Sequence, residues 1–168
     1  MLRSRAIAAV LSLAVCLLGL LVATPPAQAD GPGVGTPWVV TLGDSYISGE
    51  AGRWAGSSNA SSSRADALGS TAYFDNASGT GETINRCHRS KSAEAFIGGG
   101  VNGLNLACSG AETATSNGDN FKPGLDFADF GAGKQGQAKM LQQFATTHRV
   151  GMVVVSIGGN DFNFADVV

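Results

Sequence analysis

Runs of apolar residues divide the chain into segments with the pattern of strands and segments with the pattern of helices. Residues 38–42, "WVVTL", are continuously apolar or β-branched and lead into "GDS", which is typical of a strand buried on both faces of a parallel sheet. A second, weaker strand is expected at 101–107, "VNGLNLA". The clearest strand is expected at 150–157, "VGMVVVSI", where the pattern breaks at two glycines.

Segments with the residue spacing of helices lie between these predicted strands. Residues 136–148 are predicted as a helix with one apolar face, interpreted as core packing and made of Met140, Leu141, Phe144 and Ala145. Another helix is expected to start at 111–113. The insertion 48–100 is rich in Gly, Ser, Ala and Asn, with one short helix expected around 92–96. Strand, insertion, strand, helix and strand in this order predict an α/β fold with a parallel sheet.

The first 29 residues have the pattern of a secretory signal peptide. Two arginines precede a long apolar run, and Ala-Gln-Ala before Asp30 fits a cleavage site. An uncleaved membrane anchor is the alternative, because the run approaches spanning length. Residues 30–37 are then a Gly/Pro linker and 38–168 one domain. Without Arg3 and Arg5 the chain has 9 basic against 13 acidic side chains, and no Lys/Arg cluster suggests a nucleic-acid partner.

Cys87 and Cys108 are the cysteines that remain after cleavage. In an exported protein such a pair most simply forms a disulfide, which would stabilise the fold by about 3 kcal/mol by closing a loop of about 20 residues. Two free thiols or a metal site are the alternatives. Two cysteines with only His88 adjoining one of them make a poor zinc set, so no metal and no cofactor is expected.

Small or polar residues follow each predicted strand, where sites form in parallel sheets. Ser45 in "GDS" is a candidate nucleophile, although Asp44 and Ser45 also suit a turn or helix cap. Gly110 in "CSG" allows its backbone N–H to approach a ligand, and Asn160 in "GGND" can donate to an oxyanion. Each residue alone reads as an ordinary turn residue.

Taken together, "GDSYISGEAG", "NLACSGAET" and "SIGGND" resemble three blocks of the SGNH (GDSL-like) hydrolases, in the right order and each after a strand. With "RCHRS", the chain is similar to the secreted bacterial lipase and esterase branch, where the two cysteines are bridged. The resemblance implies a flavodoxin-like three-layer α/β/α sandwich and hydrolysis of small or lipid carboxylic esters by a monomer. It implies Ser45 as nucleophile, with the Ser45 and Gly110 N–H groups and the Asn160 side chain as oxyanion hole.

The family's fourth block, D-x-x-H, supplies the catalytic base and is absent here. His148 precedes the last strand and Asn160 follows it, so about 25 Å of strand separates them. His88 lies in the "CHRS" segment, where the family does not keep its base. We therefore interpret residues 38–168 as the N-terminal part of such a domain, almost inactive alone. A non-catalytic module that binds lipid or polysaccharide, and a carbohydrate O-deacetylase, are the alternative functions.

Overall fold

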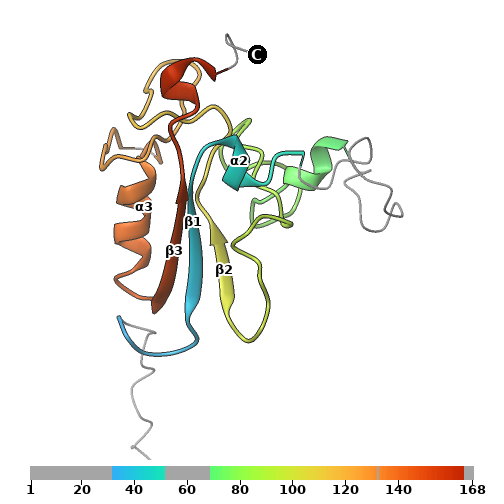
Figure 1. Cartoon of the computed structure of the whole chain (residues 1–168), viewed down its shortest axis with the longest axis vertical. Coiled ribbons are helices and arrows are strands. Elements are labelled where there is room, and N and C mark those ends of the chain that lie inside the picture. The colour runs from blue at the N-terminus through green and yellow to red at the C-terminus, as the bar shows by residue number, and fades with distance from the viewer. Residues whose placement is uncertain (1–31, 52–68, 132, 165–168) are drawn as a thin grey trace, which may run out of the picture.

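The computed structural model describes residues 32–51, 69–131 and 133–164 (Figure 1). The predicted signal peptide, residues 1–29, lies outside them. Residues 32–37 of the predicted linker contain no helix or strand. Within the described ranges, no helix is both long enough and apolar enough to cross a membrane.

Three parallel strands form the sheet, in the order β2-β1-β3 (Figure 1). β1 (Trp38–Gly43) is the central strand, between β2 (Asn102–Asn105) and β3 (Val150–Ser156). All three strands were predicted, although β2 is shorter than its apolar run. The α/β fold with a parallel sheet is thus confirmed, whereas the flavodoxin-like sandwich stays a prediction.

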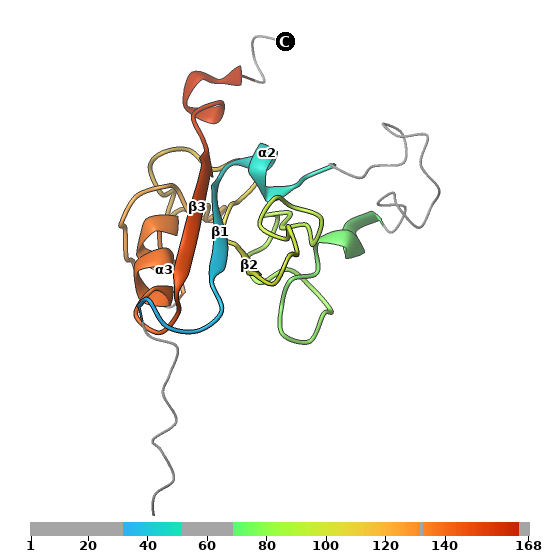
Figure 2. The ribbon, with the colours of Figure 1, turned by 60° about the horizontal axis from the view of Figure 1, so that its bottom comes forward.

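One face of the sheet carries the larger hydrophobic cluster. Val40, Leu42 and Leu106 form its buried centre, and α3 (Gln137–Phe144) packs against it. Figure 2 shows α3 running alongside β3 and β1. Burying a side chain such as Leu42 contributes about 1.5–3 kcal/mol. Three residues of the predicted apolar face, Met140, Leu141 and Phe144, pack against this cluster. Ala145 is instead the C-cap residue, since the helix ends at Phe144 rather than at 148.

Loops rather than helices lie beside β2. Gly103 lies so close to Ala95 that an added Cβ would be 2.5 Å from the Ala95 carbonyl oxygen. The helix expected around 92–96 is wrong, since this segment consists of turns. The side chain of Ser90 accepts the Ser92 N–H at 3.0 Å, and Phe96 N–H donates to the Ala93 carbonyl.

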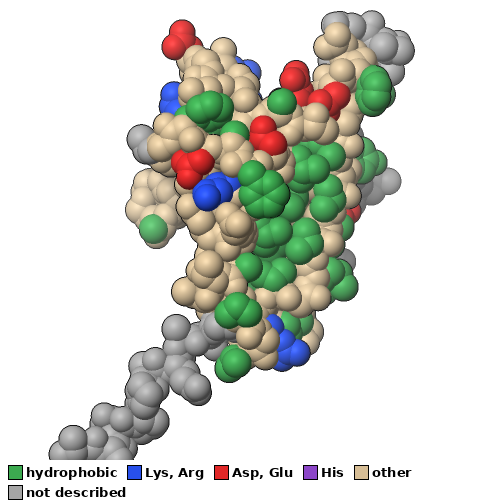
Figure 3. Space-filling view, turned by 90° about the vertical axis from the view of Figure 1, so that its left-hand side faces the viewer, with side chains coloured by type: hydrophobic (Ala, Val, Ile, Leu, Met, Phe, Trp, Pro, Cys, Tyr) green, Lys and Arg blue, Asp and Glu red, His purple; other side chains and the backbone are tan. Residues whose placement is uncertain are grey.

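β3 lies at the edge of the three-stranded sheet, with no described strand on its outer side. Met152, Val153 and Val155 are exposed although they belong to the most apolar strand of the chain. Figure 3 views the side where α3 lies in Figure 1 and shows hydrophobic side chains gathered there. The apolar pattern therefore predicted this strand correctly, although none of its side chains is fully buried.

Candidate active site

Ser45 is the first residue of the short helix α2 (Ser45–Ser48), directly beyond the carboxyl end of β1. Asp44 is the N-cap, and its side chain accepts the Tyr46 N–H at 3.0 Å. Capping, the alternative considered for both residues, is thus carried out by Asp44. None of the described residues forms a hydrogen bond with the Ser45 hydroxyl or accepts from its N–H. Ser45 is half-buried beside the fully exposed Tyr46.

Gly43 makes this turn possible. Its φ of +142° is a conformation that residues with a side chain rarely adopt, and an added Cβ would be 1.7 Å from the Ser156 carbonyl oxygen. The next residue, Asp44, donates its N–H to that same oxygen at 3.0 Å. The sheet therefore continues one residue past β1 and brings the Ser45 turn against the end of β3.

Gln137, the first residue of α3, holds the same turn from the other side. Its Oε1 accepts the Gly43 N–H at 2.6 Å, and its Nε2 donates to the Gly43 carbonyl at 2.9 Å and to the Pro123 carbonyl at 2.7 Å. The side chain is completely buried. Its role was not predicted from the sequence. The sequence does place Gln137, a polar residue, on the same helical face as the apolar Met140, Leu141 and Phe144.

Gly110 lies beyond the end of β2, where the Cys108 N–H donates to the Gly43 carbonyl at 3.0 Å. Its φ is +76°, and its N–H has no acceptor among the described residues. The helix expected from 111 onward is wrong. Instead, the Thr113 N–H and hydroxyl both donate to the Asp161 carboxylate, which pulls this segment toward the end of β3. These bonds also lower the pKa of Asp161, chiefly through the hydroxyl.

Asn160 begins a short 3-10 turn beyond β3, Asn160–Phe162. Its Nδ2 donates to the Ala111 carbonyl at 2.7 Å, directly after Gly110. An amide nitrogen carries two protons, so this bond orients the group and leaves a second proton for another acceptor. The ends of β2 and β3 are therefore joined through the side chains of Asn160 and Asp161.

A cavity of about 350 Å³ lies at this edge of the sheet, and Ser45 and Asn160 both line it. Tyr46, Ile157 and Phe164 supply most of its apolar wall. Gly110 does not line the cavity, although its neighbour Ala111 contacts Asn160. The structure thus brings two of the three predicted site residues into one cavity, and the third is the residue before Ala111, which Asn160 contacts.

The two histidines of the chain lie elsewhere. His148 stacks on Phe144 and forms a T-shaped pair with Trp38, at the amino end of β1, opposite the end that bears Ser45. His88 stacks on Tyr73, and its Nδ1 is 2.6 Å from a carboxylate oxygen of Glu50. Neither histidine lines the Ser45 cavity.

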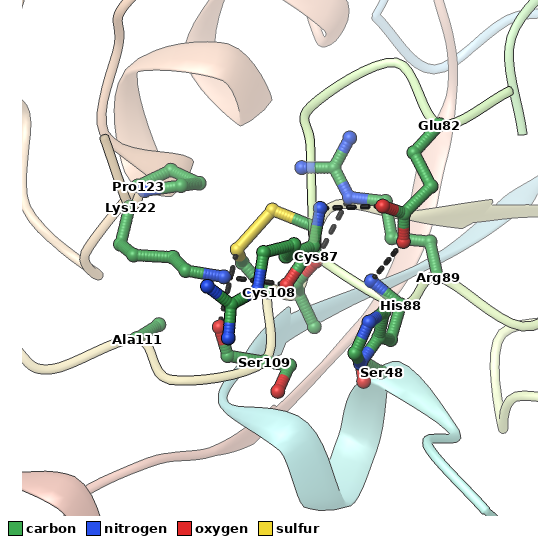
Figure 4. The surroundings of a disulfide bond; sticks show 12 residues. Ser48, Glu82, Cys87, His88, Arg89, Cys108, Ser109, Ala111, Lys122 and Pro123 are labelled. Carbon is green, nitrogen blue, oxygen red and sulfur yellow. Dashed lines mark hydrogen bonds between the residues drawn. A yellow bond between two sulfur atoms is a disulfide. The ribbon is translucent and has the colours of Figure 1, made fainter. Parts of the chain in front are cut away.

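Cys87 and Cys108 form a disulfide, as predicted (Figure 4). The Ser109 hydroxyl beside it donates to Glu50 at 2.6 Å, so one carboxylate joins the loop after α2 to both the His88 and the Ser109 segments. Glu50 also escaped the sequence reasoning, because nothing in "SGEAG" distinguishes it from a solvent-exposed charge. The described residues include no group of three or more His, Cys, Asp or Glu side chains placed to hold a metal ion.

Comparison of the chain with models of known protein families, with curated proteins and with solved structures found no match.

Proposed function

We propose that the chain carries the nucleophile and oxyanion-binding part of an exported serine ester hydrolase of the SGNH type. One observation supports this most directly. Ser45 and Asn160, from the ends of two neighbouring parallel strands, line one cavity, and the Ser45 hydroxyl has no partner among the described residues. The disulfide is consistent with export, because such bonds persist in oxidising compartments.

In this proposal the Ser45 oxygen attacks the ester carbonyl carbon and loses its proton to a base. The carbonyl oxygen then carries the negative charge, which the Ser45 and Gly110 N–H groups and the Asn160 amide would stabilise. Collapse of this intermediate expels the alcohol, which takes up a proton. Water then hydrolyses the acyl–Ser45 ester and releases the acid.

No histidine lines this cavity, so the base has no candidate among the two histidines of the chain. Losing one member of a catalytic triad can cost on the order of 10⁶ in turnover. We therefore propose very slow turnover by this chain alone. The same observation favours the second function, a non-catalytic module with an ester-hydrolase-like architecture, and the two are separated by whether Ser45 can react at all.

A fluorophosphonate probe tests this point when imidazole is added as an external base. Attack by Ser45 forms an oxygen–phosphorus bond and releases fluoride, and peptide mass spectrometry locates the adduct. We expect the adduct on Ser45 and its loss in Ser45→Ala, while Ser116→Ala, an exposed serine, is labelled like the parent.

The oxyanion arm uses Asn160→Ala, which we expect to slow labelling about 10²–10³-fold. Asn117→Ala removes an exposed asparagine and serves as the matched control. Because Asn160→Ala also removes the bond to Ala111, circular dichroism must show that the variant is folded. Equal labelling of Ser45 and surface serines, or an unchanged rate in folded Asn160→Ala, would refute the proposal.

A further inference from the structure

A cavity of about 460 Å³ lies away from Ser45. Its wall comes from the segment that precedes the disulfide, 83–86, and from the loop segments 119–122 and 133–134. A volume of this size is within the range of ligand-binding cavities. The cavity is not used by the proposed ester hydrolysis.

Positive charge dominates this cavity. Arg86, Lys122 and Lys134 line it, with Asp119 as the one acidic residue of the lining. Elsewhere Arg89 and Lys139 form ion pairs with carboxylates, whereas none of the three cavity cations does so with a described acidic side chain.

The surroundings of Lys122 disfavour its charged form. Partial burial, and next the charge of Arg86, lower the pKa of Lys122, against the opposing effect of Glu82 and Glu50. Its ammonium donates to the Arg86 carbonyl oxygen and has further protons to donate. An anion in the cavity would relieve the repulsion between the two cations.

The remaining wall is unlike that of a plain anion site. Thr83, Asn85 and Asn120 contribute a hydroxyl and two amides, while Ile84 and Phe121 contribute apolar surface. A sugar ring, which carries hydroxyl groups and has apolar C–H faces, matches such a wall. Amides can form hydrogen bonds with the hydroxyl groups, and an aromatic ring can pack on the C–H groups. Inorganic phosphate would interact with the cationic side chains alone.

The cavity is also built from constrained backbone. Arg86 has a φ of +59°, its N–H is accepted by the Glu82 carboxylate, and it immediately precedes the disulfide. Figure 4 shows Lys122 extending from the loop beside Pro123 toward the disulfide. Ser116 and Lys122 pair through two backbone hydrogen bonds, of 3.0 and 3.1 Å. Such restraint reduces the ordering cost of binding.

We propose that this cavity binds an acidic saccharide, with its carboxylate at Arg86, Lys122 and Lys134 and its ring against Phe121. The inference concerns binding alone, so it does not depend on Ser45 being a nucleophile.

Isothermal titration calorimetry with trigalacturonate tests the inference, with maltotriose as the neutral trisaccharide and inorganic phosphate as the plain anion. We expect trigalacturonate to bind, maltotriose to bind far more weakly, and added salt to weaken binding by screening. Lys134→Gln should weaken trigalacturonate binding about tenfold, the size of one hydrogen bond to a charged group. Lys91→Gln removes an exposed lysine outside the cavity and should leave binding unchanged.

Phe121→Ala separates a saccharide from a plain anion, since it should weaken trigalacturonate binding and leave phosphate binding as it was. The inference is overturned if trigalacturonate binds no more tightly than maltotriose, or if Lys91→Gln and Lys134→Gln have equal effects. Phosphate binding as tightly as trigalacturonate would overturn the saccharide assignment. Fluorophosphonate labelling of Ser45 is a separate readout, so failure of either proposal is recognised independently.

Discussion

Replacing Gln137 by leucine tests whether one buried amide holds the turn that presents Ser45. Leucine keeps most of the side-chain volume but can neither donate nor accept a hydrogen bond. The Gly43 N–H and the Pro123 carbonyl would then lose their partner, whereas the Gly43 carbonyl would keep the Cys108 N–H at 3.0 Å.

The expected magnitude follows from these two orphaned groups. A buried polar group left unsatisfied costs about 1–3 kcal/mol, so two of them cost about 2–6 kcal/mol. Burying additional leucine carbon offsets this by about 1–2 kcal/mol. Taking the middle of each range, we expect Gln137→Leu to lower the free energy of unfolding by about 2.5 kcal/mol, a substantial part of the roughly 5–15 kcal/mol of a typical domain.

Urea unfolding followed by far-ultraviolet circular dichroism measures this change. Gln143→Leu, on the exposed side of the same helix, is the matched control and should change stability by less than about 0.5 kcal/mol. Gln137→Glu should be at least as destabilising as Gln137→Leu, because a carboxylate cannot donate to the two carbonyls. A loss below about 1 kcal/mol in Gln137→Leu, or one equal to that of the control, would refute the reasoning.

Two further predictions concern the disulfide and one carboxylate. Replacing both Cys87 and Cys108 by alanine should cost about 3 kcal/mol, given their separation of 21 residues, and an unchanged urea midpoint would contradict this. Although partial burial acts in the opposite direction, hydrogen bonds from the Thr115 hydroxyl and N–H and from the Ala128 N–H lower the pKa of Asp126. A lowered folded-state pKa stabilises the fold above about pH 4 and loses that contribution as the pH falls through it, so the parent's advantage over Asp126→Asn should shrink in acid urea titrations and not at neutral pH.

Local pattern was sufficient for the elements with the most continuous or most regular apolar residues. The β-branched runs predicted β1 and β3, and the spacing of Met140, Leu141 and Phe144 predicted the packed face of α3. These signals are local, because the periodicity of a buried face repeats within a few residues.

The errors arose where distant residues determine the conformation. The segment after Gly110 would suit a helix by its own residues, but Asp161 binds Thr113 and the Gly124 backbone lies against Ala114. The turns around 92–96 similarly depend on close contact with Gly49 and Gly103. Such contacts cannot be predicted from the pattern of neighbouring residues.

The residues of the candidate site likewise include some that local sequence could predict and some that it could not. Ser45 and Asn160 could be predicted because they follow recognisable strands, and their shared cavity follows from the parallel pairing of β1 with β3. Gln137 and Glu50 could not, because their roles depend on partners that the fold alone brings near.

The central position of β1 has a consequence for the order in which the chain can fold. β1 is complete by Gly43, yet its partners are Asn102–Asn105 on one side and Val150–Ser156 on the other. Pairing strands so far apart in sequence requires large loops to close. The entropic cost of closing them comes before the stabilising contacts form, which slows folding. A chain emerging from the ribosome would therefore leave the β3-facing edge of β1 unpaired until residues 150–156 have been made, although β2 could already pair with its other edge.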